Sequence, residues 1–242
     1  MKALVLAGGR GNRLNELTSE QNKCMIKVRG KRMIEYNLDC ALSVDDVDEI
    51  VLVVGYKAET IINFLGNSYK GKTIKYVIQS EQKGLVHAIE CAQSLINGDD
   101  FLLLLGDEML FNPKHQSMVR EFKKDKDIFG ICGIVKVRDR SQIKKTYTLI
   151  QGTNNDIFRL IEKPRNPFND FQGTGHCLFR NKIYNYIRYT PIHHERNEKE
   201  LPDLIQCVID DAMTVKSFII CDKYVNINTF EDVKMAEGFF HE

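Results

Sequence analysis

A glycine-rich segment with two arginines follows the first apolar run of the chain. It comprises Leu6 and Ala7, which end the run, and then Gly8, Gly9, Arg10, Gly11, Asn12 and Arg13. A backbone without Cβ atoms can approach a ligand closely, and successive amides in such a turn form a nest for an anion. Arg13, Arg10 and the later Lys23 add positive charge. The segment predicts a binding loop for a phosphate-bearing ligand, with a plain glycine turn as the alternative; its spacing is neither the GxGxxG fingerprint nor a P-loop.

A carboxylate follows another apolar run. Asp107 comes directly after FLLLLG, residues 101–106. Ligands of open parallel sheets lie beyond the carboxyl ends of the strands, and Mg²⁺ prefers oxygen ligands. Asp107 is therefore a candidate Mg²⁺ ligand, and the alternative is a turn or helix-cap residue.

Composition narrows the classes of partner. Among 242 residues, 34 Lys and Arg nearly balance 33 Asp and Glu, giving a net charge of +1. We therefore expect small-molecule partners, and neither nucleic acid nor a membrane. Seven cysteines stand singly without CxxC spacing, which is typical of a reducing compartment. The start of the chain does not resemble a signal peptide, and the longest apolar run is too short to span a bilayer. We expect a cytoplasmic location.

The first half of the chain alternates between two periodicities. Apolar runs that indicate buried strands alternate with segments of helical spacing, and this order predicts right-handed crossovers and a mostly parallel sheet covered on both faces. The expected strands are 2–7, 49–55, 73–79 and 101–107, and the expected helices are 31–42, 58–65 and 84–96.

The pattern changes after Asp107, because several expected strands follow one another with only short segments between them. The segment TNND predicts a hairpin turn between two of them. Expected strands are 128–137, 147–152, 156–164, 173–179 and 215–220, and expected helices are 181–187, 201–212 and one from about 230. The whole pattern predicts a single α/β domain, residues 1–242, built as a Rossmann-like three-layer sandwich with a mixed, mostly parallel sheet. Its halves are 1–112 and 113–242.

Several segments in order resemble one family. LAGGRGNRL, followed by NKCMIKVRGKRMIEY, resembles the GGxGTRL…K…GKPMIxY motif of the sugar-phosphate nucleotidyltransferases. The later segments QSEQKGLVHAI, LLLLGDE, LIEKP and VNINTFEDVKMAE resemble that family's base-reading, metal-binding, sugar-phosphate and closing segments. The chain is most similar to short, glucose-1-phosphate thymidylyltransferase-like members without a C-terminal repeat domain. The resemblance implies a nucleotidyltransferase fold, related to that of GT-A enzymes, with a nucleotide-binding first half and a sugar-phosphate-binding second half.

The resemblance also implies a reaction. A nucleoside triphosphate and a sugar 1-phosphate would give a nucleotide sugar and pyrophosphate, with catalysis by charge neutralisation and alignment. The implied catalytic residues are Arg13, Lys23, Asp107 and Lys163. Gln79 and Gly84 would read the base, and Asp107 with Asn226 would hold Mg²⁺. The implied acceptor contacts are Glu162, Lys163, Gly173, Thr174, Gly175 and Tyr224. Relatives commonly assemble, so a homo-oligomer is expected.

Three departures from the family pattern leave alternatives open. Asn226 stands where the family has a second aspartate, Asn12 replaces a threonine, and Cys24 and Met25 follow the lysine in place of a proline-rich stretch. An amide oxygen ligates Mg²⁺ without adding charge, so an inactive nucleotide-sugar-binding regulator is one alternative. A cytidylyltransferase for phosphocholine or a phosphonate is another. A glycosyltransferase of related fold needs no triphosphate cradle and is disfavoured.

Overall fold

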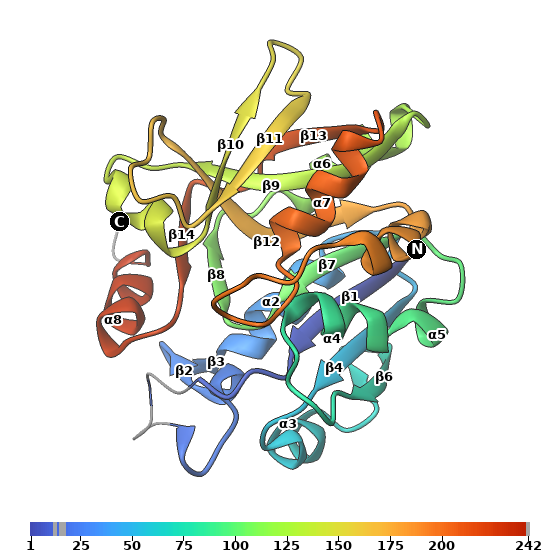
Figure 1. Ribbon diagram of the computed structural model, residues 1–242. Coiled ribbons are helices and arrows are strands. Elements are labelled where there is room, and N and C mark those ends of the chain that lie inside the picture. Colours follow the sequence, from blue (N-terminus) through green and yellow to red (C-terminus); the bar gives the residue numbers. More distant parts are fainter. Residues whose placement is uncertain (12–13, 15–17, 241–242) are drawn as a thin grey trace.

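An eight-stranded mixed sheet runs through the centre of the protein (Figure 1). The computed structural model describes residues 1–11, 14 and 18–240. Across the sheet the order is β13-β9-β12-β7-β1-β4-β6-β5. The strands are β1 (Lys2–Ala7), β4 (Glu49–Val54), β5 (Ser68–Tyr69), β6 (Lys72–Ile78), β7 (Phe101–Leu105), β9 (Ile128–Lys136), β12 (Phe171–Phe179) and β13 (Thr214–Ile219).

Most neighbouring strands of this sheet are parallel. β1 runs parallel to β4 and β7, β4 to β6, and β9 to β13. β12 is antiparallel to both β7 and β9, and the short β5 is antiparallel to β6. The predicted mixed, mostly parallel sheet is confirmed. Strands from both predicted halves, 1–112 and 113–242, belong to this one sheet; the division of binding roles between the halves stays a prediction.

Helices cover both faces of the sheet, as the strand–helix alternation predicts. One face packs against α2 (Met33–Leu42), α3 (Ala58–Leu65) and α6 (His115–Lys124). The other packs against α4 (Leu85–Cys91), α5 (Gln93–Ile96), α7 (Leu201–Asp210) and the 3₁₀ helix η4 (Asn181–Tyr189). The result is a three-layer sandwich.

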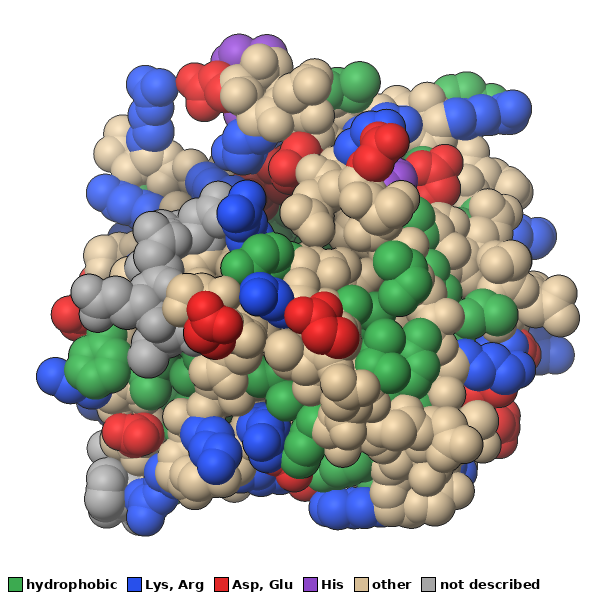
Figure 2. Space-filling model, turned by 90° about the horizontal axis from the view of Figure 1, so that it is seen from below, with side chains coloured by type: hydrophobic (Ala, Val, Ile, Leu, Met, Phe, Trp, Pro, Cys, Tyr) green, Lys and Arg blue, Asp and Glu red, His purple; other side chains and the backbone are tan. Residues whose placement is uncertain are grey.

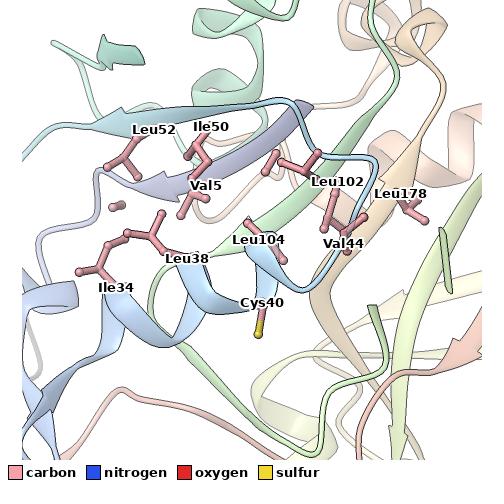
Figure 3. Packing of buried hydrophobic residues seen from close by; sticks show 14 of the residues in the cluster. Val5, Ile34, Leu38, Cys40, Val44, Ile50, Leu52, Leu102, Leu104 and Leu178 are labelled. Carbon is pink, nitrogen blue, oxygen red and sulfur yellow. The ribbon is translucent and has the colours of Figure 1, made fainter. Parts of the chain in front are cut away.

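Strand periodicity divides the core between the two faces. On β1, Val5 belongs to the cluster under α2, whereas Leu4 belongs to the cluster under α4 and α7. Figure 3 shows the first cluster, where Leu52 and Leu104 from the strands lie near Leu38 of α2. Because the central strands are buried on both faces, their loops have a rigid base.

Several smaller elements lie around the sheet. Two-residue strands β2 (Lys27–Val28) and β3 (Lys31–Arg32) pair with each other, β8 (Glu108–Phe111) pairs with β14 (Lys223–Asn226), and β10 (Tyr147–Gln151) pairs with β11 (Ile157–Glu162). The β10–β11 hairpin projects from the top of the molecule in Figure 1. The remaining elements are the 3₁₀ helices η2 (Lys23–Met25) and η3 (Arg140–Lys145) and the helix α8 (Phe230–Gly238).

Two local expectations differ from the structure. The helix expected over 84–96 is two helices, because the Ala92 amide donates to Ile89 O in a tighter turn between α4 and α5. The segment expected as a helix over 181–187 is the 3₁₀ helix η4. No helix in the part of the chain that the structure describes is long and apolar enough to cross a membrane.

Candidate active site

A pocket of about 570 Å³ opens beyond the carboxyl ends of β1 and β7. This is the sheet edge at which ligands of open α/β folds bind. We call it the nucleotide pocket. Its lining includes the sequence-predicted residues Leu6, Ala7, Gly8, Gly9, Arg10, Lys23, Gln79, Gly84, Asp107 and Asn226.

The glycine turn packs closely against its surroundings. A Cβ atom on Gly8 would lie 2.8 Å from Gln79 Oε1, so a side chain there would strike the residue predicted to read the base. Gly11 has a φ of +67°, and its Cα faces the aliphatic part of Lys23. The Arg10 guanidinium lies 5.2 Å from the centre of the Tyr56 ring. The predicted contacts of Asn12 and Arg13 lie outside the described residues.

A buried asparagine fixes the start of the Lys23 turn. Asn22 Nδ2 donates to Ala7 O at 2.9 Å and to Tyr56 O at 2.8 Å, and its Oδ1 accepts from the Cys24 amide at 2.8 Å. Asn22 therefore caps η2 and ties it to the end of β1. Cys24, which stands where the family is proline-rich, is buried in this turn.

Lys23 joins the glycine turn to the predicted metal ligands. Its Nζ donates to Asp107 Oδ2 at 2.7 Å and to Asn228 Oδ1 at 3.1 Å. Asn228 Nδ2 donates in turn to Asn226 Oδ1 at 2.9 Å. The Lys23 side chain is only 6% exposed, whereas that of Asp107 is 30% exposed and faces the pocket. The four side chains form one hydrogen-bonded row between β7 and β14.

Gln79 is held rigidly at the other end of the nucleotide pocket. Its Nε2 donates to Gly84 O at 3.1 Å and lies 3.0 Å from His87 Nδ1. In that arrangement His87 Nδ1 accepts the hydrogen bond from Gln79. Gln79 Oε1, which lies on the side of Gly8, remains as an acceptor for a ligand. Gly84 has a φ of +89°, and a Cβ atom on it would meet the Glu198 side chain. His87, which the helical pattern predicts to be structural, is half-buried and orients Gln79.

A second, smaller pocket of about 160 Å³ adjoins the first. We call it the acceptor pocket. The two pockets share Leu85, Leu105 and Asn226 as lining residues. The predicted acceptor contacts that line it are Glu162, Lys163, Gly173, Thr174 and Gly175, and further lining comes from Glu108, Lys145, Thr146, Tyr147, Glu200, Leu201 and Pro202.

Lys163 has an unusual backbone conformation. Its φ is +42°, in the left-handed region that non-glycine residues rarely adopt, and it precedes Pro164, which favours extended backbone. The Lys163 amide donates to Thr146 O at 2.6 Å and holds this conformation. Lys163 Nζ lies 2.9 Å from Glu162 Oε1. Burial raises the pKa of Glu162, although Lys163 opposes that shift. Strained backbone of this kind concentrates at functional sites.

The glycine segment of β12 lines the acceptor pocket mainly with its backbone. Thr174 Oγ1 donates to Gly133 O at 2.9 Å, so this hydroxyl points away from the pocket. The Gly175 amide donates to both carboxylate oxygens of Glu108, at 2.8 and 3.1 Å. A Cβ atom on Gly173 would lie within the Tyr147 ring, and one on Gly175 would lie within Leu105. These glycines allow the close packing that shapes the pocket.

The predicted contact between Tyr224 and a ligand needs correction. Tyr224 lies among the residues behind the pockets, where its ring is buried and its hydroxyl donates to Glu108 Oε1 at 2.6 Å. The reason is the antiparallel β8–β14 ladder, in which Tyr224 pairs with Leu110 and Asn226 pairs with Glu108. Tyr224 thus supports Glu108 rather than covering the ligand.

Glu108 is a buried carboxyl group in contact with two other strands, β12 and β14. Besides Gly175 and Tyr224, its Oε2 lies 3.6 Å from Nε2 of the buried His176. Burial raises the pKa of Glu108 to about 8, and the hydrogen bond from Tyr224 only partly offsets this. Burial also lowers the pKa of His176 well below its usual value, so the neighbouring imidazole is neutral.

Replacing Glu108 with glutamine should change how stability depends on pH. The folded pKa of about 8 exceeds the ordinary value of 4.5, so wild-type stability falls as the pH rises from about 4.5 to about 8. The Glu108→Gln variant does not titrate, and its Tm relative to wild type should rise by several degrees over that window. Thermal unfolding from pH 5 to pH 9 measures this. Glu90→Gln, at an exposed site, is the control; a Glu108→Gln curve parallel to wild type would contradict the prediction.

Comparison with known proteins identifies the family. The family model described as "Nucleotidyl transferase" matches residues 2–234. The chain belongs to the nucleotidyl transferase family. Over 242 residues the nucleotidyltransferase is 31% identical to the UTP–glucose-1-phosphate uridylyltransferase AglF of Haloferax volcanii, and the match covers 100% of this chain and 97% of AglF.

A further relative agrees with this assignment, and solved structures share the fold. The nucleotidyltransferase is 28% identical to a glucose-1-phosphate thymidylyltransferase of Streptomyces griseus, with 96% of this chain and 64% of the relative covered. Its fold matches a UDP-glucose pyrophosphorylase solved with UDP-glucose, with a TM-score of 0.88, 19% identity, and 99% and 98% of the two chains covered. A putative glucose-1-phosphate thymidylyltransferase from Bacillus anthracis, solved with a sucrose, gives a TM-score of 0.86 at 23% identity, with 98% and 94% covered. These two likenesses confirm the predicted fold.

The donor set of the nucleotidyltransferase suits a hard cation. Asp107 and Asn226 line the same pocket, and carboxylate and amide oxygens are ligands that Mg²⁺ accepts. Within the described ranges, no cluster of three or more His, Cys, Asp or Glu side chains is arranged to hold a metal. Of these two candidate ligands, Asp107 alone carries a charge.

The nucleotidyltransferase also uses site residues that sequence reasoning missed. They are Asn22, Gln82, Leu85, His87, Glu108, Lys145, Glu198, Glu200 and Asn228. Asn228 has a visible signal, because the closing motif resembles xDIDT and Asn228 stands at the later of its two aspartates. Gln82, Leu85 and His87 lie within the base-reading segment, and Glu108 follows Asp107. The remaining residues reach the site through contacts between distant segments.

Proposed function

We propose that this protein transfers a nucleotidyl group from a nucleoside triphosphate to a sugar 1-phosphate. An oxygen of the acceptor phosphate attacks the α-phosphorus, a new P–O bond forms, and the bond to the bridging oxygen of the β-phosphate breaks. Pyrophosphate leaves with that electron pair. The observation that best supports this function is the pair of adjoining pockets, which share Asn226, with Lys23 and Asp107 in the lining of the nucleotide pocket.

Each pocket has groups suited to one reactant. In the nucleotide pocket, the backbone amides of the glycine turn and the Arg10 guanidinium face the triphosphate. Lys23 neutralises charge near the α-phosphate, and Arg13, by family resemblance, would hold the triphosphate tail. In the acceptor pocket, Lys163 binds the phosphate of the acceptor, and Glu162 accepts from its hydroxyls.

A divalent cation completes the charge balance. Asp107 and Asn226 would hold Mg²⁺, which supplies Lewis-acid neutralisation of the phosphate oxygens when bound. The protein's own contribution is alignment, because both reactants are anions and few groups need to gain or lose a proton.

The nucleotide base is expected to offer an N–H donor to Gln79. Both N–H groups of the Gln79 amide are directed to Gly84 and His87, which leaves Oε1 as the acceptor. The N3–H of uracil or thymine fits this acceptor. UTP and dTTP are therefore the first nucleotides to test, as the names of the relatives also suggest.

Pyrophosphate release tests the proposed function directly. UTP, dTTP, CTP, ATP and GTP are crossed with glucose 1-phosphate, other sugar 1-phosphates and phosphocholine in the presence of Mg²⁺. Release that requires one triphosphate and one sugar 1-phosphate supports the proposal. Release with CTP and phosphocholine would favour a cytidylyltransferase for a non-sugar phosphate. Triphosphate binding without release from any pair would favour a binding protein, and Asn226→Asp would then show whether the amide limits activity.

A further inference from the structure

The cation-binding face of Asp107 is already engaged by the protein itself. Lys23 Nζ lies 2.7 Å from Asp107 Oδ2, at the distance of a charge-assisted hydrogen bond. Asn228 Oδ1 is a second oxygen on the same ammonium at 3.1 Å. Asn228 also donates to Asn226 Oδ1. The ammonium is therefore surrounded by the same kinds of oxygen that a metal at this place would use.

The position of Lys23 is built into the fold. Its side chain is 6% exposed, and η2 is anchored through Asn22 to Ala7 and Tyr56. The position of Asn228 is fixed as well, because its backbone amide donates to Asp232 Oδ2 at 2.9 Å. Asp232 accepts from Lys145 Nζ at 3.1 Å. Lys23 and Asn228 are therefore both held by contacts that do not depend on a ligand, and the Ile227 amide donates to Asp107 O at 3.0 Å.

A metal and this ammonium compete for one carboxylate. Asp107 is the carboxylate of the nucleotide pocket that pairs with Lys23, and Asn226 lines the same pocket. A divalent cation bound there, with the ammonium still in place, would experience strong repulsion in a partly buried site. A triphosphate changes the balance, because its oxygens can take both the metal and the ammonium.

We propose that the Lys23 ammonium occupies the cation position beside Asp107 in the nucleotide-free enzyme. The divalent metal then enters with the nucleotide, whose phosphates draw Lys23 away from Asp107. This inference rests on the proposed function, in which one site binds nucleotide and metal. Lys23 thus has two roles in sequence: it holds Asp107 before binding, and it contacts phosphate afterwards.

Binding of Mn²⁺ to the nucleotide-free protein tests the proposal without any turnover. Mn²⁺ accepts the same oxygen ligands as Mg²⁺, and its EPR signal reports the free ion. Wild type should show no saturable binding at millimolar Mn²⁺. Lys23→Met removes the competing charge and should lower the Kd for Mn²⁺ by about tenfold or more. Lys23→Gln keeps a polar group beside Asn228 and should show the same gain, so the test survives if the methionine variant folds poorly.

Two further variants show where the additional Mn²⁺ binds in the Lys23 variants. Adding Asp107→Asn to Lys23→Met should abolish the gain. Lys114→Met also removes a lysine paired with a carboxylate, at the exposed Asp222 outside both pockets; this variant should behave like wild type. Saturable Mn²⁺ binding by wild type with the affinity of the Lys23 variants would overturn the proposal. So would two folded Lys23 variants that gain no affinity. If either result were obtained while the wild-type protein released pyrophosphate normally, this inference would fail and the proposed function would stand.

Discussion

The Asp107→Asn variant should lose roughly a thousandfold or more in kcat. The substitution keeps the size of the side chain and its ability to accept from Lys23, which lies 2.7 Å away. It removes the carboxylate charge beside Lys23 in the nucleotide pocket, and with it the charged ligand that a metal would use there. Pyrophosphate release under saturating substrates measures the loss.

The control for this variant makes the same chemical change elsewhere. Asp45→Asn alters an exposed aspartate outside both pockets and should retain wild-type kcat. The Tm of both variants shows whether they fold. An Asp107→Asn enzyme that stays within tenfold of wild type would contradict the assigned role.

Replacing Lys163 with methionine should weaken use of the acceptor alone. We expect kcat/KM for the sugar phosphate to fall roughly a hundredfold to a thousandfold, with little change in the Kd for the nucleotide. Lys163 lines the acceptor pocket, where Glu162 and the left-handed backbone hold its ammonium in place. Steady-state kinetics and nucleotide titration separate the two effects.

A neighbouring surface lysine provides the comparison. Lys144 is exposed and does not contribute to the lining of the acceptor pocket, so Lys144→Met should leave both parameters unchanged. If Lys163→Met reduces nucleotide affinity and acceptor use equally, Lys163 does not belong to the acceptor pocket alone.

The strongly periodic parts of the fold could be predicted from the sequence. The buried runs of β1, β4 and β7 lie where continuous apolar residues indicate them, and α3 spans the expected residues 58–65. The β8–β14 ladder was missed because each strand has only four residues and mixes polar with apolar side chains. Helix α6 was missed because basic and polar residues conceal its buried positions Met118, Val119 and Phe122.

The residues of the candidate site also differ in whether local sequence can predict them. The residues that follow strands, such as Gly8 and Asp107, could be located from local sequence, because the carboxyl edge of a parallel sheet collects them. Asn228 reaches Lys23 across 205 positions of sequence, and Tyr224 reaches Glu108 across 116. Contacts of that separation depend on tertiary packing, so no local pattern indicates them. Local sequence therefore indicates neither the buried position of Tyr224 nor its hydrogen bond to Glu108.

The short β8–β14 ladder also sets the tolerance of the chain to insertion and deletion. Asn226 lies opposite Glu108, next to Asp107, so the two metal-ligand candidates depend on one pairing register. Adding or deleting a single residue within β14 would turn Asn226 to the other face of the ladder and separate it from Asp107. The tip of the β10–β11 hairpin around Asn154 is exposed, and its contacts, from Lys216 and Ser217 of β13, lie outside both pockets. A tag or fluorescent label should therefore be inserted at that tip. Insertions and deletions should likewise be tolerated better there than in β14, the four residues before Ile227.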